Sequence, residues 1–298
     1  MVAGQITHEG REGPKRFSSK MEGTTRVPGG RNATTRNGLR GGNVRRLAGV
    51  EVRAYEASVG ERRLSYEVAG EGEPVVLVHG LSGSTRWWDR TVPVLAAHHR
   101  VYLVDLPGFG SMRRAEGGFV LSEAADWLSS WMETVGLERT HLAGHSMGGY
   151  ISIVLAARCP ETLRRLVLVA PAGVPTGRSM PGYLIPLLQA GRYMTPGFLP
   201  VLARDALRTG PLTLLGAARE LLAQDVRDYL REITAPTLLV WGHRDTLVPP
   251  SAGDVLRAEI PDSRLLLLEG AGHVPMFERA AETNAAILSF LAGREVGE

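Results

Sequence analysis

Short apolar runs recur along this chain, and most are followed by a segment with helical character. The runs lie at residues 74–80, 101–106, 140–144, 166–170, 237–242 and 264–268, and the helical segments at 85–97, 121–135, 146–158, 251–259 and 278–291. A short run of consecutive apolar residues is typical of a strand that is buried on both faces of a sheet. Strands that alternate with helices predict an α/β fold, with a mostly parallel, twisted sheet flanked by helices.

Two further strands are predicted before this alternation begins. Residues 52–59 and 62–69 flank Gly60-Glu61, a pattern that favours an antiparallel hairpin. The predicted sheet therefore has about eight strands.

A long insertion separates the sixth predicted strand from the seventh. It runs from about Ala172 to Arg231, is rich in Leu, Met, Phe, Gly and Pro, and has helical character over residues 217–229. Ordinary loops are much shorter than this. Because an insertion at the carboxyl ends of parallel strands overhangs the ligand crevice, we expect a helical cap over the site.

The N-terminal segment differs in composition from the rest of the chain. Residues 1–46 hold ten Lys and Arg against three acids, so the remainder is slightly acidic although the whole chain carries a net charge of +3. We interpret residues 1–47 as a disordered basic extension and residues 48–298 as one domain. The acidic balance of that domain does not favour nucleic acid as a partner.

The cysteine content and the absence of long apolar runs bear on the cellular compartment of the protein. Cys159 is the only cysteine, which excludes an intramolecular disulfide and a Cys-based metal cluster. No secretion signal and no apolar run of about 20 residues, the length that spans a bilayer, is evident. We expect a cytoplasmic protein without a membrane span, and a homo-oligomer remains open.

The chemistry is indicated by Gly144-His-Ser146-Met-Gly148, a Gly-x-Ser-x-Gly motif between a predicted strand and a predicted helix. Such a turn holds serine on a strained backbone, and the glycines let strand and helix approach closely. The serine hydroxyl then stands above the sheet, and the Met147 amide lies at a helix N-terminus, where it can stabilise an oxyanion. We predict Ser146 as the nucleophile.

A serine nucleophile needs a base, and eight histidines are available. His273 lies between the last predicted strand and the last helix, so it can reach over the carboxyl edge of the sheet, whereas His98 and His99 are expected at the surface at the end of a helix. Asp245 follows the penultimate strand and is predicted to orient His273. The chain order serine, acid, histidine fits this assignment.

A second oxyanion donor is expected in the loop that follows the first parallel strand. Its sequence is His79-Gly-Leu-Ser-Gly-Ser84, in which Gly80 permits a tight turn. We expect the Leu81 amide to point into the site, beside that of Met147.

Five motifs in register resemble the α/β-hydrolase superfamily, in particular its capped esterase, lactonase and perhydrolase-like members, over residues 50–295. They are His79-Gly-Leu-Ser-Gly, Asp105-Leu-Pro-Gly-Phe-Gly, Gly144-His-Ser-Met-Gly-Gly, Gly242-His-Arg-Asp and Gly272-His-Val-Pro. The resemblance implies the α/β-hydrolase fold with a cap after strand six, and a turn-shaping role for Asp105. A serine nucleophile argues against the dehalogenase and epoxide-hydrolase branches, which use a carboxylate. His145, where carbon–carbon bond hydrolases often carry Asn, counts against that branch.

We therefore expect hydrolysis of a small-molecule carboxylic ester through an acyl-enzyme, without a cofactor or a metal. Short to medium, largely apolar acyl groups are expected because six apolar side chains gather in the cap and beside the oxyanion loop: Trp87, Trp88, Leu184, Leu187, Met194 and Phe198. Ordinary packing of the cap would explain the same residues. The alternatives are cofactor-free perhydrolase or haloperoxidase-like chemistry, lactone hydrolysis or carbon–carbon bond hydrolysis by the same triad, and a non-enzymatic receptor.

Overall fold

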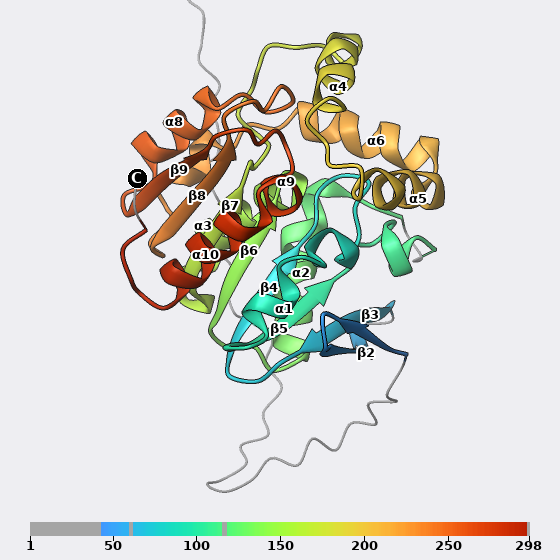
Figure 1. Ribbon diagram of the computed structural model, residues 1–298, viewed down its shortest axis with the longest axis vertical. Coiled ribbons are helices and arrows are strands. Elements are labelled where there is room, and N and C mark those ends of the chain that lie inside the picture. The colour runs from blue at the N-terminus through green and yellow to red at the C-terminus, as the bar shows by residue number, and fades with distance from the viewer. Residues whose placement is uncertain (1–42, 60–61, 115–117, 297–298) are drawn as a thin grey trace, which may run out of the picture.

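A single twisted sheet organises the molecule (Figure 1). The computed structural model describes residues 43–59, 62–114 and 118–296. Within these ranges nine strands pair in the order β1-β2-β3-β5-β4-β6-β7-β8-β9. The first three pairs in this order, from β1 to β5, are antiparallel, and the remaining five pairs are parallel, which confirms the mostly parallel sheet. The strands are β1 (Val44–Leu47), β2 (Val50–Val59), β3 (Arg62–Ala69), β4 (Glu73–Val78), β5 (His99–Val104), β6 (Thr140–His145), β7 (Leu163–Val169), β8 (Thr237–Gly242) and β9 (Ser263–Leu268).

Helices cover both faces of the sheet, so the central strands are buried on both sides. Successive residues of β4 alternate between two apolar cores: Val76 and Val78 belong to one, and Val75 and Leu77 to the other. The first core is covered by α2 (Ala124–Thr134), α3 (Met147–Arg158) and α8 (Ser251–Glu259), and the second by α1 (Val92–Leu95), α9 (Pro275–Glu278) and α10 (Ala280–Leu291). This two-sided burial explains the unbroken apolar runs of the sequence.

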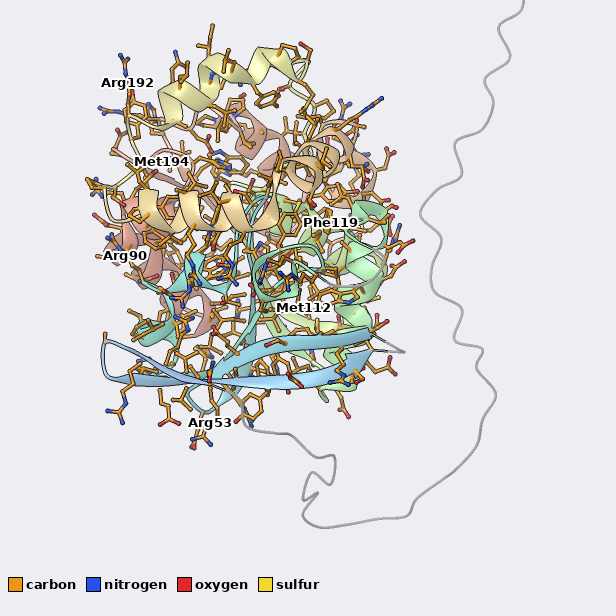
Figure 2. All side chains as sticks on the ribbon, turned by 90° about the vertical axis from the view of Figure 1, so that its right-hand side faces the viewer. Arg53, Arg90, Met112, Phe119, Arg192 and Met194 are labelled. Atoms are coloured by element: carbon orange, nitrogen blue, oxygen red, sulfur yellow. The ribbon has the colours of Figure 1, made fainter. Side chains whose placement is uncertain are left out.

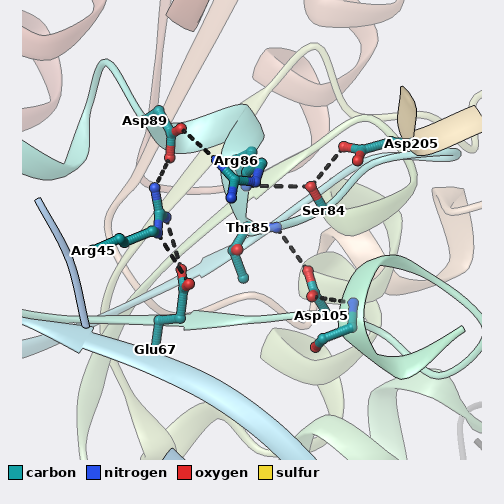
Figure 3. A network of polar contacts seen from close by, with 9 residues as sticks. Arg45, Glu67, Ser84, Thr85, Arg86, Asp89, Asp105 and Asp205 are labelled. Atoms are coloured by element: carbon teal, nitrogen blue, oxygen red, sulfur yellow. Dashed lines mark hydrogen bonds and ion pairs between the residues drawn. The ribbon is translucent and has the colours of Figure 1, made fainter. Parts of the chain in front are cut away.

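The ninth strand corrects one prediction. Residues 44–47 were assigned to the disordered extension, but they form β1, which pairs with β2. The Arg45 guanidinium donates to both carboxylate oxygens of Glu67, at 3.0 and 2.7 Å, and to Asp89 at 2.5 Å (Figure 3). The strand is held by partners distant in sequence, which a local pattern does not show. The rest of the predicted extension, residues 1–42, lies outside the described residues.

A second correction concerns the segment before β5. A helix was predicted over residues 85–97, but the chain forms the 3-10 turn η1 (Thr85–Trp88) and the short helix α1, which Pro93 helps to begin. The strand β5 then begins at His99, whose side chain is buried instead of exposed. The remaining 3-10 turns of the described chain are η2 (Gly110–Met112), η3 (Leu121–Glu123), η4 (Pro160–Thr162) and η5 (Pro181–Tyr183).

The long insertion between β7 and β8 is helical, as its composition predicts. It contains α4 (Leu184–Ala190), α5 (Leu199–Thr209), α6 (Pro211–Leu222) and α7 (Arg227–Leu230). The first three helices lie together on one side of the molecule, opposite the β2–β3 hairpin (Figures 1 and 2). None of the described helices combines the length and the apolar character that a membrane crossing requires.

Candidate active site

Ser146 occupies a strained turn between β6 and α3. Its φ and ψ angles are 51° and −114°, a region that residues with a Cβ rarely adopt. Neighbouring glycines are required by close packing: a Cβ on Gly144 would lie 2.4 Å from the Gly148 carbonyl oxygen, and a Cβ on Gly149 would lie 2.6 Å from Pro171. The local sequence thus dictates the sharp turn that raises the serine above the sheet.

Two loops bring a histidine and an aspartate to this serine. His273 follows β9, and its Nε2 lies 3.0 Å from Ser146 Oγ, while its Nδ1 lies 2.7 Å from Asp245 Oδ2. The other carboxylate oxygen of Asp245, Oδ1, accepts the amides of Leu247 and Val248, which fixes its orientation. The geometry therefore brings together the three side chains that the sequence singled out.

The three side chains of the site are largely buried. Ser146, Asp245 and His273 are 8%, 4% and 9% exposed. Burial lowers the pKa of His273, but the Asp245 carboxylate, its hydrogen bond and the charge of Glu278 outweigh burial, so the pKa is raised above its ordinary value of 6.5. A buried imidazole whose Nδ1–H is bound by a carboxylate can accept a proton from a serine hydroxyl at Nε2.

The loop after β4 lies beside the serine. A Cβ built on Gly80 would stand 3.1 Å from Ser146 Cβ. The Gly80 carbonyl accepts from His79 Nδ1 at 2.8 Å and from the Gly83 amide at 3.0 Å. Because N–H and C=O point in opposite directions across a trans peptide, the Leu81 amide points away from these donors. Met147 is the first residue of α3, so its N–H is one of the amides that the helix leaves without an internal partner.

His79 is a functional residue for which sequence reasoning found no role. It is fully buried, and its Nε2 accepts the Leu106 amide at 3.0 Å while its Nδ1–H holds the Gly80 carbonyl. Burial lowers the pKa of its imidazole, which favours the neutral ring with one donor and one acceptor. His79 thus fixes the loop of the expected oxyanion donor, and a histidine directly before a strand-end glycine was the available signal.

The six side chains expected to line an apolar pocket separate into two groups. Trp87, Trp88 and Phe198 are buried in the core beneath the cap, with the Phe198 ring 5.0 Å from Trp87. Their burial favours packing at these three positions, and their contact with an acyl group stays a prediction, because apolar residues that pack and those that contact ligand look alike in sequence. Leu184 and Leu187 are exposed on α4, and Met194 is half-buried against the core.

The cap contacts the loops that carry the histidine and the aspartate. A Cβ on Gly272 would lie 3.2 Å from Tyr193 Cβ of the cap, and Arg244 stacks on the Tyr193 ring. A buried carboxylate of α5, Asp205, accepts the Ser84 hydroxyl at 2.6 Å (Figure 3). The cap is therefore joined to the oxyanion loop as well as to the histidine loop.

Asp105 has the turn-shaping contacts that were expected of it. Its two carboxylate oxygens accept the amides of Thr85 and Ser111, each at 2.7 Å, and so tie two loops together (Figure 3). No three His, Cys, Asp or Glu side chains gather as a candidate metal site in the part of the chain that the structure describes.

Comparison with known proteins supplies the family. The family model described as "Alpha/beta hydrolase family" matches residues 75–286. The chain is 34% identical over 238 residues to the pimeloyl-[acyl-carrier protein] methyl ester esterase of Aeromonas hydrophila, covering 71% of this chain and 92% of that one. It is 31% identical over 277 residues to the 2-hydroxy-6-oxo-6-phenylhexa-2,4-dienoate hydrolase of Comamonas testosteroni, covering 80% and 96%.

A solved structure agrees with this family. The thermophilic esterase of Thermogutta terrifontis superposes with a TM-score of 0.68 at 25% identity, covering 80% of this chain and 98% of that one. The fold predicted from the five motifs is thereby confirmed. With more than two thirds of its length matched by the family model, this chain belongs to the alpha/beta hydrolase family.

Proposed function

We propose that this hydrolase cleaves carboxylic esters through an acyl-enzyme intermediate on Ser146. The observation that carries the proposal is the hydrogen-bonded chain from Ser146 through His273 to Asp245, with distances of 3.0 and 2.7 Å. Three loops that are distant in sequence converge to make it. Structural packing alone does not require a buried serine, histidine and aspartate in this order of contact.

In the proposed mechanism, Ser146 Oγ attacks the ester carbonyl carbon and His273 Nε2 takes the hydroxyl proton. Asp245 holds the imidazole by its Nδ1–H and stabilises the imidazolium. The Leu81 and Met147 amides stabilise the oxyanion. His273 then protonates the departing alcohol. Water attacks the acyl-enzyme while His273 takes its proton, and His273 returns that proton to Ser146 Oγ as the bond to the acyl group breaks and the acid product leaves. Loss of one oxyanion donor typically costs on the order of 10²–10³ in rate.

We propose that the substrates are esters whose acyl groups are short to medium in length and largely uncharged. Support comes from the cap, where Met194 packs half-buried above the core and Leu184 and Leu187 present apolar surface. Ser146 and His273 are largely buried, so a charged acyl group would lose hydration beside them. Esterases among the relatives favour the same reaction type.

A panel of p-nitrophenyl esters from acetyl to palmitoyl, run on wild type and Ser146→Ala, tests this proposal. We expect the substitution to lower kcat by on the order of 10⁴–10⁶. A fluorophosphonate probe should label the wild type and fail to label the variant. Full hydrolysis by Ser146→Ala would refute the nucleophile, and highest rates on charged or very long acyl chains would refute the proposed substrate class.

Carbon–carbon bond hydrolysis is the second candidate, because the Comamonas testosteroni relative is a 2-hydroxy-6-oxo-6-phenylhexa-2,4-dienoate hydrolase. That dienoate belongs in the same panel, together with a lactone and a peroxide-dependent halogenation assay. Turnover of the dienoate that exceeds turnover of every ester would favour this candidate over the esterase. Both use the same nucleophile, so Ser146→Ala remains the common control.

A further inference from the structure

A carboxylate that the proposed mechanism does not use lies behind the His273 loop. Glu278 belongs to α9, five residues after His273, and its Oε2 accepts the Gly272 amide at 2.5 Å. Glu278 therefore binds the backbone directly before His273.

The same loop is held from the opposite side by His145. Its Nε2 lies 2.8 Å from the His273 carbonyl oxygen, to which it donates. The His145 ring is fully buried between Trp87 and His273, with ring centroids at 5.5 and 4.9 Å. Burial keeps the pKa of His145 well below 6.5, so the ring is neutral and its single N–H is the one bound to the loop.

We propose that Glu278 is a positioning residue for the reaction: it holds the backbone directly before His273 so that Nε2 stays in line with the Ser146 hydroxyl. His145 completes this hold by fixing the carbonyl of His273 itself. The inference rests on the proposed function, because it assigns a role relative to His273 as the base. A displacement of about 1 Å at a reacting group can cost on the order of 10² in rate, so holding the loop has a measurable value.

The charge of Glu278 gives this role a second signature. The titratable groups that face its carboxyl are His273 and Asp245, and Tyr193 of the cap packs beside Gly272. Burial raises the pKa of Glu278 to about 7, against the opposing effects of the Gly272 amide and His273. In its ionised form Glu278 in turn raises the pKa of His273. Loss of the Glu278 charge should therefore lower the pKa of His273, whereas loss of the contact to the loop should lower kcat.

Two substitutions separate position from charge. Glu278→Gln removes the charge and weakens the contact to the Gly272 amide, whereas Glu278→Asp keeps the charge but withdraws the carboxylate from the loop. The matched control is Glu220→Gln. Glu220 lies in α6 of the cap, and its carboxylate also accepts a backbone amide, that of Leu121 in η3, at 2.8 Å. For each variant, kcat, KM, melting temperature and the pH dependence of kcat/KM are measured on the best ester of the panel, with Ser146→Ala alongside.

We expect Glu278→Gln to lower kcat by on the order of 10-fold to 100-fold with KM within about twofold of wild type, and to move the acid limb of the pH profile to lower pH. Glu278→Asp should lower kcat but leave the acid limb in place. If Glu278→Gln does not fold, the loss of kcat in Glu278→Asp tests the positioning role by itself. Glu220→Gln should change neither kcat nor the acid limb.

Wild-type kcat and an unmoved acid limb in folded Glu278→Gln would overturn the inference while leaving the esterase proposal intact, provided that Ser146→Ala is inactive. An equal loss of kcat in Glu220→Gln would also overturn it, because the effect would then be one of general stability. Activity retained by Ser146→Ala would refute the proposed function itself, and the inference with it.

Discussion

Phe198 offers a direct test of how the cap is attached, because its side chain is fully buried although it comes from an insertion that is otherwise largely exposed. Its ring lies 5.0 Å from Trp87 and 4.7 Å from Phe277, directly before the start of α5. We read it as an anchor that fixes the cap to the core. The perturbation is Phe198→Ala.

The structure sets the expected size of the effect. Truncation of a fully buried phenylalanine to alanine costs about 3–5 kcal/mol of unfolding free energy, through lost transfer energy and the cavity that remains. The two aromatic contacts account for about 0.5–1.5 kcal/mol each within that total. For a domain of this size, each kcal/mol lowers the melting temperature by about 2–4 °C. We therefore expect Phe198→Ala to melt on the order of 10 °C below wild type.

Thermal unfolding followed by circular dichroism, together with the ester panel, decides the question. Leu187→Ala is the matched control, since Leu187 lies in the same cap but is 54% exposed, and its truncation should change the unfolding free energy by no more than about 0.5 kcal/mol. The reasoning would be refuted by a Phe198→Ala variant that melts with wild type but prefers longer acyl chains. Phe198 would then line an acyl pocket, as its sequence position first suggested.

Three further predictions concern the backbone, the base and a buried carboxylate. A Cβ on Gly148 would lie 2.5 Å from a backbone carbonyl oxygen at the end of β4, so Gly148→Ala should abolish hydrolysis and lower the melting temperature. The control is Gly216→Ala, because Gly216 faces open space within α6. This substitution should raise the unfolding free energy, measured by urea titration, by up to about 1 kcal/mol. Activity requires the neutral base, so kcat/KM should rise with pH through a pKa above 6.5, and Asp245→Asn should move that limb to lower pH; an unmoved limb would contradict the role of Asp245. Burial raises the pKa of Asp205 above its ordinary 3.8, so the folded protein binds this proton more tightly than the unfolded chain, and stability present at low pH is lost as pH rises through the folded pKa. As pH rises from 3.8 through the folded pKa, the melting temperature of wild type should therefore fall relative to that of Asp205→Asn. A difference between the two that does not change with pH would contradict this reasoning.

The sequence alone predicted that Ser146, Asp245 and His273 lie close together, and the physical reason is that each lies in the segment that follows a predicted strand. Parallel strands all place their carboxyl ends at one edge of the sheet, so residues at these ends converge whatever the details of packing. The Gly-x-Ser-x-Gly spacing adds a signal that is readable from adjacent residues, although the space that requires Gly148 is limited by the carbonyl groups at the end of β4. The fold and the three candidate site residues could therefore be predicted without coordinates.

Other features depend on partners that are distant in the chain. The sequence around Arg45 indicates a polar extension, whereas the structure places its guanidinium against the carboxylates of Glu67 and Asp89. Phe198 carries the same apolar character whether it packs or binds ligand, and its contact with Trp87 is visible only in the tertiary structure. Such roles come from non-local contacts.

The hold on the His273 loop shows the same limit most clearly. Glu278 binds a backbone amide, which every residue except proline carries, and His145 binds a carbonyl, which every residue carries, so no residue type in the sequence marks them as partners. The pattern of strands and turns determined where the reactive side chains meet. Only the tertiary structure decided what holds them there, because that depends on distances between atoms far apart in the chain.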